Sequence, residues 1–136
     1  MIKNIIFDFG DIFINLDKAA TIKELKVLGV SEIPESFYQV YYQYEKGEIS
    51  TDTFISYFQK ECGLEKEALI FAWNAILLDF PMRRLNFVKT LAASKKYRLF
   101  LLSNTNELHI SWIQNNWGME LYKEFKNCFE QFYLSH

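Results

Sequence analysis

The sequence is poor in cysteine and histidine, with two of each among its 136 residues. Cys62 and Cys128 lie far apart and lack metal-type spacing. We therefore expect free, buried thiols and a reducing, cytoplasmic location. His109 is expected on a helix surface near the rim of a crevice, and His136 is the last residue. Neither histidine has a plausible metal partner.

Long apolar runs and an excess of one charge are also absent. No apolar stretch reaches the ~18 residues of a transmembrane helix, and Asp8 interrupts the first apolar run too early for a signal peptide. The 15 basic and 17 acidic residues give a net charge of −2, which argues against nucleic-acid binding through bulk electrostatics. We expect neither nucleic acid nor membrane as a partner. The composition is compatible with small ligands and with protein partners.

What the sequence has is the material for a core: 50% of its residues are hydrophobic and 18% are aromatic. The length suits one domain with a small insert. The continuous apolar run at residues 5–7 predicts a strand buried on both faces, as in parallel sheets. A turn at 9–11 and a short extended or bulged piece at 12–14 follow. Further strands are predicted at 98–102 and 129–134.

Between the first two strands the apolar pattern is helical. Capping residues and glycines predict four short helices without an intervening strand. These helices are expected to begin near Asp17, Pro34, Ser50 or Thr51, and Glu65, and Gly29, Gly47 and Gly63 end the first three. Another helix opens at Pro81, and two more, ending near Asn116 and Lys126, precede the last strand.

This order predicts an α/β fold: a partial, Rossmann-like parallel sheet of about three strands with an inserted four-helix segment. Residues 1–14 and 81–136 would form the core, and residues 15–80 the insert. An insert directly after the first strand lies over the carboxyl ends of the strands, where open α/β sheets bind ligands.

Polar residues follow the first two strands at that edge. Asp8 ends the first strand, and Ser103 and Asn104 end the second. Backbone N–H groups at residues 104–105 and at the next helix N-terminus would favour an anion such as phosphate. A carboxylate facing phosphate implies a divalent cation, for which Mg²⁺ is the natural choice. Asp8 could then attack phosphorus and form an aspartyl-phosphate.

Each signal also has a plainer explanation. A strand-end aspartate is often a turn residue, and residues 103–105 (SNT) form an ordinary helix-capping cluster. Residues 8–10 (DFG) match a kinase motif, but a kinase needs a large domain before it. The tyrosines at 38, 41, 42 and 44 fit a bundle core and surface better than a nucleic-acid platform, because no basic groove accompanies them.

Together the two motifs resemble a known family. Residues 5–13 (IIFDFGDIF) and 101–109 (LLSNTNELH) resemble the first and second motifs of haloacid dehalogenase-like (HAD) hydrolases. Residues 44–50 (YEKGEIS) resemble a cap-domain stretch of a subgroup that includes phosphatases acting on α-glucose 1-phosphate and other sugar phosphates. The resemblance runs in order over essentially the whole chain.

The resemblance implies a Mg²⁺-dependent phosphatase acting on a small phosphorylated metabolite through an aspartyl-phosphate. It assigns Asp8 as nucleophile and metal ligand, and the backbone carbonyl of Gly10 as a second metal ligand. Ser103 would hold the phosphate with Asn104 beside it. The helical insert would be the cap that closes on the substrate and sets specificity.

Two departures from the family pattern bear on activity. Most family phosphatases have a proton-donating acid at the position of Gly10, although some subgroup members also carry glycine there; Asp11 is one place further on, so its side chain is expected to point elsewhere. The family's third motif supplies a basic residue and its fourth an acidic pair, yet no Lys or Arg follows Lys126 and no Asp follows Asp79.

The departures leave two hypotheses. The chain is either the amino-terminal portion of a phosphatase or a catalytically inactive HAD-like domain that acts as a ligand-binding or interaction module. A reading frame that continues past His136 into a basic residue and an Asp-Asp pair would favour the enzyme. For a chain that ends at His136, we expect an unpaired, apolar first strand and self-association.

Overall fold

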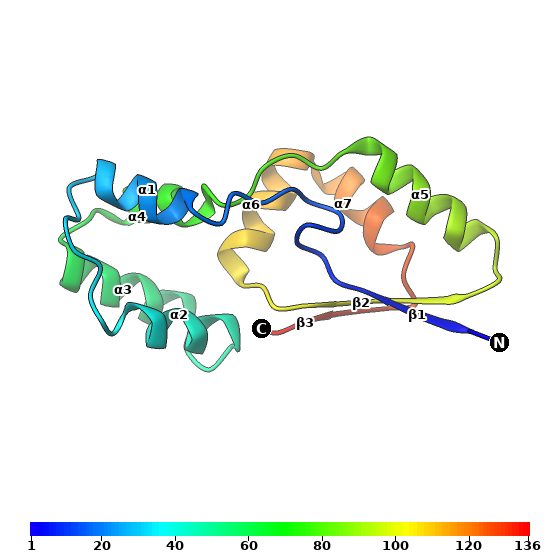
Figure 1. Cartoon of the computed structure of the whole chain (residues 1–136), viewed down its shortest axis with the longest axis horizontal. Coiled ribbons are helices and arrows are strands. Elements are labelled where there is room, and N and C mark those ends of the chain that lie inside the picture. Colours follow the sequence, from blue (N-terminus) through cyan, green and yellow to red (C-terminus); the bar gives the residue numbers. More distant parts are fainter.

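The computed structural model describes residues 1–136 as an α/β fold with three parallel strands and seven helices (Figure 1). The sheet has the order β1 (Asn4–Phe7), β2 (Arg98–Ser103), β3 (Gln131–Leu134). Its register aligns Phe7 with Leu101, so the carboxyl ends of β1 and β2 lie at the same edge. The α/β fold with a partial parallel sheet that the sequence predicts is confirmed.

Four helices directly follow β1 in the sequence, and we call this segment the helical insert. It packs around its own cluster of ten buried residues, in which Phe54 and Phe58 are completely buried. The Ser50 hydroxyl caps the third helix by accepting from the Thr53 N–H at 3.1 Å. The helices are α1 (Ala20–Val27), α2 (Phe37–Glu45), α3 (Thr51–Cys62) and α4 (Lys66–Asn74).

Three further helices cover one face of the sheet (Figure 1). The other face is open, with Ile6 66%, Leu102 59% and Tyr133 53% exposed. The prediction that the first strand is buried on both faces is therefore wrong at Ile6, because the helices of residues 1–136 lie on one side of the sheet. The covering helices are α5 (Met82–Ala93), α6 (Glu107–Trp117) and α7 (Met119–Lys126).

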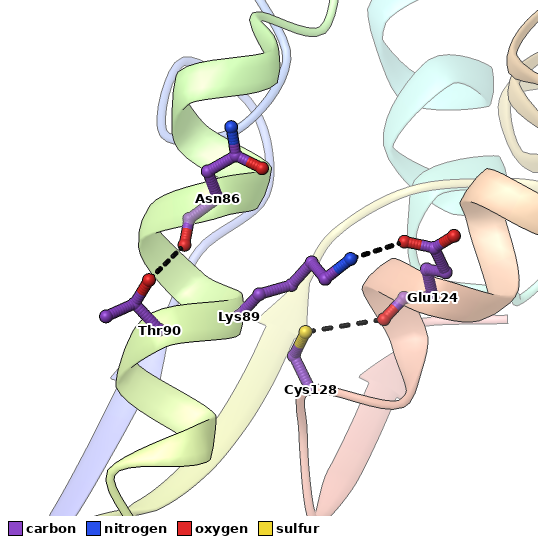
Figure 2. Close-up of polar contacts among 5 residues, drawn as sticks. All are labelled: Asn86, Lys89, Thr90, Glu124 and Cys128. Carbon is purple, nitrogen blue, oxygen red and sulfur yellow. Dashed lines mark hydrogen bonds and ion pairs between the residues drawn. The ribbon is translucent and has the colours of Figure 1, made fainter.

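Helices α5 and α7 lie side by side, and Figure 2 shows the polar contacts at this junction. The Lys89 ammonium lies 2.7 Å from a Glu124 carboxylate oxygen, and the Cys128 thiol donates to the Glu124 carbonyl at 3.3 Å. The ion pair is half-exposed, so its net contribution to stability is small. Packing of the apolar side chains beneath it therefore holds the helices. Cys62 and Cys128 are free, half-buried thiols.

The segment after β1 is anchored by two phenylalanines. Phe9 and Phe13 are buried, and both rings contact Phe125 of α7. The Phe13 N–H donates to the Phe9 carbonyl at 2.9 Å, so residues 11–13 form a turn. The predicted extended or bulged piece at 12–14 is therefore wrong for Ile12 and Phe13, whereas Ile14 forms an isolated β-bridge with Gly10. A turn is needed because an extended chain of this length would carry the two rings too far apart to share one partner. The polar residues between them stay at the surface.

No helix of the chain combines the length and the apolar character needed to cross a membrane.

Candidate active site

A shallow hollow of about 350 Å³ lies at the carboxyl ends of β1 and β2. Asp8, Gly10, Ser103 and Asn104 all line it, so the structure brings together the four residues that the sequence singles out. The parallel pairing of β1 with β2 is the cause, since it places the residues following both strands at one edge.

Two oxygen atoms in the hollow are available to a cation. Asp8 is exposed; its Oδ1 accepts from the Phe9 N–H at 2.6 Å, and its Oδ2 makes no hydrogen bond within the chain. The Gly10 carbonyl oxygen also accepts no hydrogen bond. The chain has no cluster of three or more His, Cys, Asp or Glu side chains suited to a metal. Within residues 1–136, a cation held here would have these two oxygen atoms as its ligands.

The Ser103 hydroxyl is free to meet a ligand. Ser103 is 5% exposed, yet its hydroxyl makes no hydrogen bond within the chain. Every side-chain polar atom that is fully buried has a partner. The Ser103 hydroxyl must therefore reach the hollow that this residue lines. The Asn104 N–H likewise has no partner within the chain.

Two of the other backbone donors expected here are occupied. The Thr105 N–H donates to the Ser135 hydroxyl at 3.0 Å, and the His109 N–H donates to Oδ1 of Asn106, which caps α6, at 3.1 Å. For these two amides the prediction of a free donor facing phosphate is wrong, because the segment after β3 and the capping side chain satisfy them. Of the loop amides, those of Asn104 and Asn106 have no partner within the chain.

Neither residue near the family's acid position supplies a proton. A Cβ added to Gly10 would lie 2.8 Å from Cδ1 of Leu16, so the Leu16 side chain fills that space. Asp11 lines the same hollow as Asp8, contrary to expectation, but its carboxylate lies 2.9 Å from the Lys18 ammonium. The hydrogen bond from Lys18 lowers the pKa of Asp11, and an ionised carboxylate cannot donate a proton.

A larger cavity of about 440 Å³ adjoins the hollow. The two share Gly10, Ser103 and Asn104, and the cavity extends to Glu45 of α2 and Trp73 of α4. Cavities of this size suit small metabolites. The edge of the sheet and the helical insert thus enclose one space between them.

A buried polar network joins the insert to α6 beside this cavity. Asn106 is completely buried; its Oδ1 accepts from the Trp73 indole at 3.2 Å and its Nδ2 donates to Glu45 at 2.8 Å. The His109 ring stacks on Trp73, and its Nδ1 lies 2.8 Å from Oδ1 of Asn74. The expected surface position of His109 is wrong because α6 packs against α4. Burial lowers the pKa of His109 to about 3 and raises that of Glu45.

The positions of Glu45, Asn106 and His109 in this network were not predicted from the sequence. Asn106 had a usable signal, since an asparagine three residues before His109 suits a helix N-cap. Glu45 lies in the 44–50 stretch that resembles a cap-domain motif, but nothing in that stretch indicates its partner. Asn106 and Glu45 are 61 residues apart, and only the docking of the insert brings them together.

No family model matches the chain. Among curated proteins, a D-ribitol-5-phosphate phosphatase from Bacteroides thetaiotaomicron is 29% identical over 143 residues, covering 100% of this chain and 68% of that protein.

Solved structures resemble the fold closely. A HAD family enzyme from Bacteroides thetaiotaomicron, crystallised as a magnesium complex, superposes with a TM-score of 0.84 at 33% identity, over 98% of this chain and 68% of that one. The wild-type enzyme with magnesium and inorganic phosphate gives 0.84 at 32%, over 99% and 69%. A predicted HAD-like hydrolase from Porphyromonas gingivalis, 24% identical, shares the fold with a TM-score of 0.80 over 99% and 67%.

These likenesses, together with the two strand-end motifs, define the class: the chain belongs to the HAD family of hydrolases. It spans about two thirds of the length of the relatives that it matches, 68% in the case of the curated phosphatase.

Proposed function

We propose that the protein is a Mg²⁺-dependent phosphatase that acts on a small phosphorylated metabolite through an aspartyl-phosphate at Asp8. One observation carries the proposal: Asp8, the Gly10 carbonyl and the free Ser103 hydroxyl line one hollow at the ends of adjacent parallel strands. A phosphatase among the relatives, and structural neighbours crystallised with magnesium and phosphate, support it.

The donor set of the hollow fits magnesium. Asp8 offers a carboxylate oxygen and Gly10 a carbonyl oxygen, and Mg²⁺ prefers oxygen ligands while keeping several waters. When bound, the ion would neutralise the repulsion between the Asp8 carboxylate and the substrate phosphate. Water and the substrate phosphate would supply further oxygen ligands.

In this proposal Asp8 Oδ2 attacks phosphorus, the ester P–O bond breaks, and the leaving oxygen takes a proton from solvent. The Ser103 hydroxyl and the Asn104 N–H donate to phosphoryl oxygens and so stabilise the charge that they carry. Water then attacks phosphorus, releasing inorganic phosphate and the Asp8 carboxylate. Solvent supplies the first proton because Gly10 has no side chain and Asp11 is held ionised by Lys18.

We assign residues 15–80 as a cap over this site, with residues 1–14 and 81–136 as the core. The insert has its own buried cluster and provides much of the wall of the 440 Å³ cavity, so its side chains would select the leaving group. We place the protein in the cytoplasm, where its free thiols would stay reduced.

Substituting Asp8→Asn in the full-length protein tests the proposal. The amide has the shape of the carboxylate but is not a nucleophile, so we expect phosphatase activity to fall by about 10⁴-fold or more while the fold persists. Hydrolysis of p-nitrophenyl phosphate with and without Mg²⁺ measures the activity, and circular dichroism measures the fold.

The matched control is Asp52→Asn, which makes the same change at an exposed position of α3 outside the hollow. It should retain full turnover. Near-normal turnover of the Asp8→Asn protein would remove Asp8 as the nucleophile.

A further inference from the structure

Glu45 presents a hydrogen-bond acceptor to the cavity from the insert side. Its Oε1 accepts from Asn106 at 2.8 Å, and its Oε2 makes no hydrogen bond within the chain. Asn106 is itself locked, since its Oδ1 accepts from Trp73 and from the His109 N–H. The Glu45 carboxylate is therefore held in one orientation with an oxygen to spare.

His109 presents a second acceptor in the same cavity. Its Nδ1 lies 2.8 Å from Oδ1 of Asn74, and an amide oxygen can only accept, so Nδ1 carries the proton and Nε2 a lone pair. Nε2 makes no hydrogen bond within the chain, and stacking on Trp73 fixes the ring. Burial keeps the imidazole neutral, so it stays an acceptor at neutral pH.

The cavity has one positive and one negative lining residue, and they lie at different places in it. Lys18 and Glu45 are its charged lining residues. Lys18 also lines the hollow beside Asp8 and pairs with Asp11 at 2.9 Å, so its charge belongs to the phosphate side and is offset there. The negative charge of Glu45 has no cation beside it. The tyrosines at 38, 41 and 42 add hydroxyls that make no hydrogen bonds within the chain.

We propose that Glu45 and His109 form a subsite that selects phosphomonoesters whose leaving group carries neutral hydroxyls and rejects those that carry a carboxylate; this inference rests on the proposed phosphatase function. A hydroxyl can donate to either acceptor. A carboxylate has no proton to donate and is repelled by the fixed charge of Glu45, so the site combines an attraction with a repulsion.

A matched pair of three-carbon phosphates tests the subsite: glycerol 3-phosphate and 3-phosphoglycerate differ by a hydroxymethyl group against a carboxylate. We expect the full-length protein to favour glycerol 3-phosphate by about 100-fold in kcat/KM, because like charges in a partly buried site repel strongly. Glu45→Gln keeps an oxygen for Asn106 and removes the charge, so the preference should fall by about 10-fold or more. Glu48→Gln, at an exposed position that does not line the cavity, should leave it unchanged.

Binding separates this inference from the proposed function. Calorimetric titration of both compounds into the Asp8→Asn protein, with and without Glu45→Gln, gives the selectivity without turnover. Selective binding by a protein that hydrolyses no phosphomonoester would overturn the phosphatase proposal and support the subsite. Hydrolysis with a wild-type preference near one, or with equal preferences in the wild-type and Glu45→Gln proteins, would overturn the subsite and leave the phosphatase proposal standing.

Discussion

At the scale of single residues, the polar groups without internal partners mark the site. The Asp8 Oδ2, the Gly10 carbonyl and the Ser103 hydroxyl make no hydrogen bonds within the chain, whereas the nearby Thr105 amide is satisfied. An unpaired polar group near the protein interior costs free energy unless water or a ligand satisfies it. Such groups gathered in one hollow are what a ligand site requires.

Ser103→Ala should weaken catalysis modestly. The substitution removes one hydrogen bond to phosphate, which contributes about 0.5–1.5 kcal/mol when neutral, so kcat/KM should fall by about 2- to 10-fold. Steady-state kinetics of the full-length protein with Mg²⁺ measures the change. Ser94→Ala, at an exposed position after α5, is the control. If the Ser103→Ala protein had the same kcat and KM as the Ser94→Ala protein, Ser103 would be excluded from the site.

His109 should make folding stability depend on pH. The folded chain holds the pKa of His109 at about 3, against an ordinary value of 6.5, because the ring is buried. Below pH 6.5 the unfolded chain binds a proton that the folded chain does not. The free energy of unfolding is therefore fully retained above pH 6.5 and falls as pH decreases toward 3, by up to about 1.4 kcal/mol per pH unit.

Urea unfolding between pH 7 and pH 4.5 measures this dependence, with His109→Phe as the comparison. Phenylalanine keeps a ring against Trp73 but cannot titrate, so its stability should change less with pH, although the lost Asn74 partner lowers it throughout. Burial raises the pKa of Glu45, so Glu45 changes the free energy of unfolding with pH in the opposite direction. Both proteins contain Glu45, so it does not contribute to the difference between their pH slopes. Equal pH slopes for the two proteins would contradict the prediction.

At the scale of elements, two turns of the insert illustrate what positions the helices. Gly47, after α2, and Gly63, after α3, both have left-handed backbones, with φ of 70° and 66°. A Cβ added to Gly47 would lie 2.7 Å from the Ser135 carbonyl oxygen, whereas one added to Gly63 would meet nothing within 4 Å. The turn after α2 therefore packs closely against the segment that follows β3, which joins the insert to the sheet.

The two glycines allow a matched test. Gly63→Ala should cost about 1–2 kcal/mol of unfolding free energy, because alanine disfavours the left-handed backbone. Gly47→Ala carries the same backbone cost plus the clash with Ser135, so it should cost at least about 1 kcal/mol more. Urea unfolding monitored by tryptophan fluorescence compares them. Equal losses would show that the turn and the segment after β3 are not in close contact.

At the scale of the whole molecule, polar contacts join two hydrophobic centres. The insert and the sheet layer each have a buried cluster, of ten and fourteen residues. Thr51 donates to Glu107 at 2.5 Å, and the Ser135 hydroxyl donates to the Glu45 carbonyl at 2.5 Å. Each of these contacts has one partner in the insert and the other near the carboxyl edge of the sheet. This coupling sets the shape of the cavity between them.

The open face of the sheet should drive association of a polypeptide of residues 1–136 studied alone. Ile6, Leu102 and Tyr133 form an exposed apolar patch beside the edge strand β1, and such patches associate in water. Light scattering should detect oligomers that Ile6→Lys reduces. Val27→Lys, at an exposed apolar position in α1 away from the sheet, should not reduce them. A monodisperse monomer of the unsubstituted polypeptide would contradict the prediction.

The helices, the strands and the strand-end residues could be predicted from the sequence, because each depends on local pattern. Apolar periodicity and capping residues define α1 to α7 within a few residues, and the alternation of strands with helices implies a parallel sheet. A parallel sheet brings the ends of β1 and β2 to one edge, which places Asp8 near Ser103 without further information.

What only the tertiary structure decided depends on how the insert docks. The position of α6 against α4 buries His109, joins Asn106 to Glu45 across 61 residues and forms the cavity that His109 and Glu45 line. Ser135 satisfies the Thr105 amide for the same reason: the groups are distant in sequence and adjacent only after folding. Local pattern determined the elements and the catalytic edge, whereas long-range packing determined which donors stay free and which acceptors face the ligand.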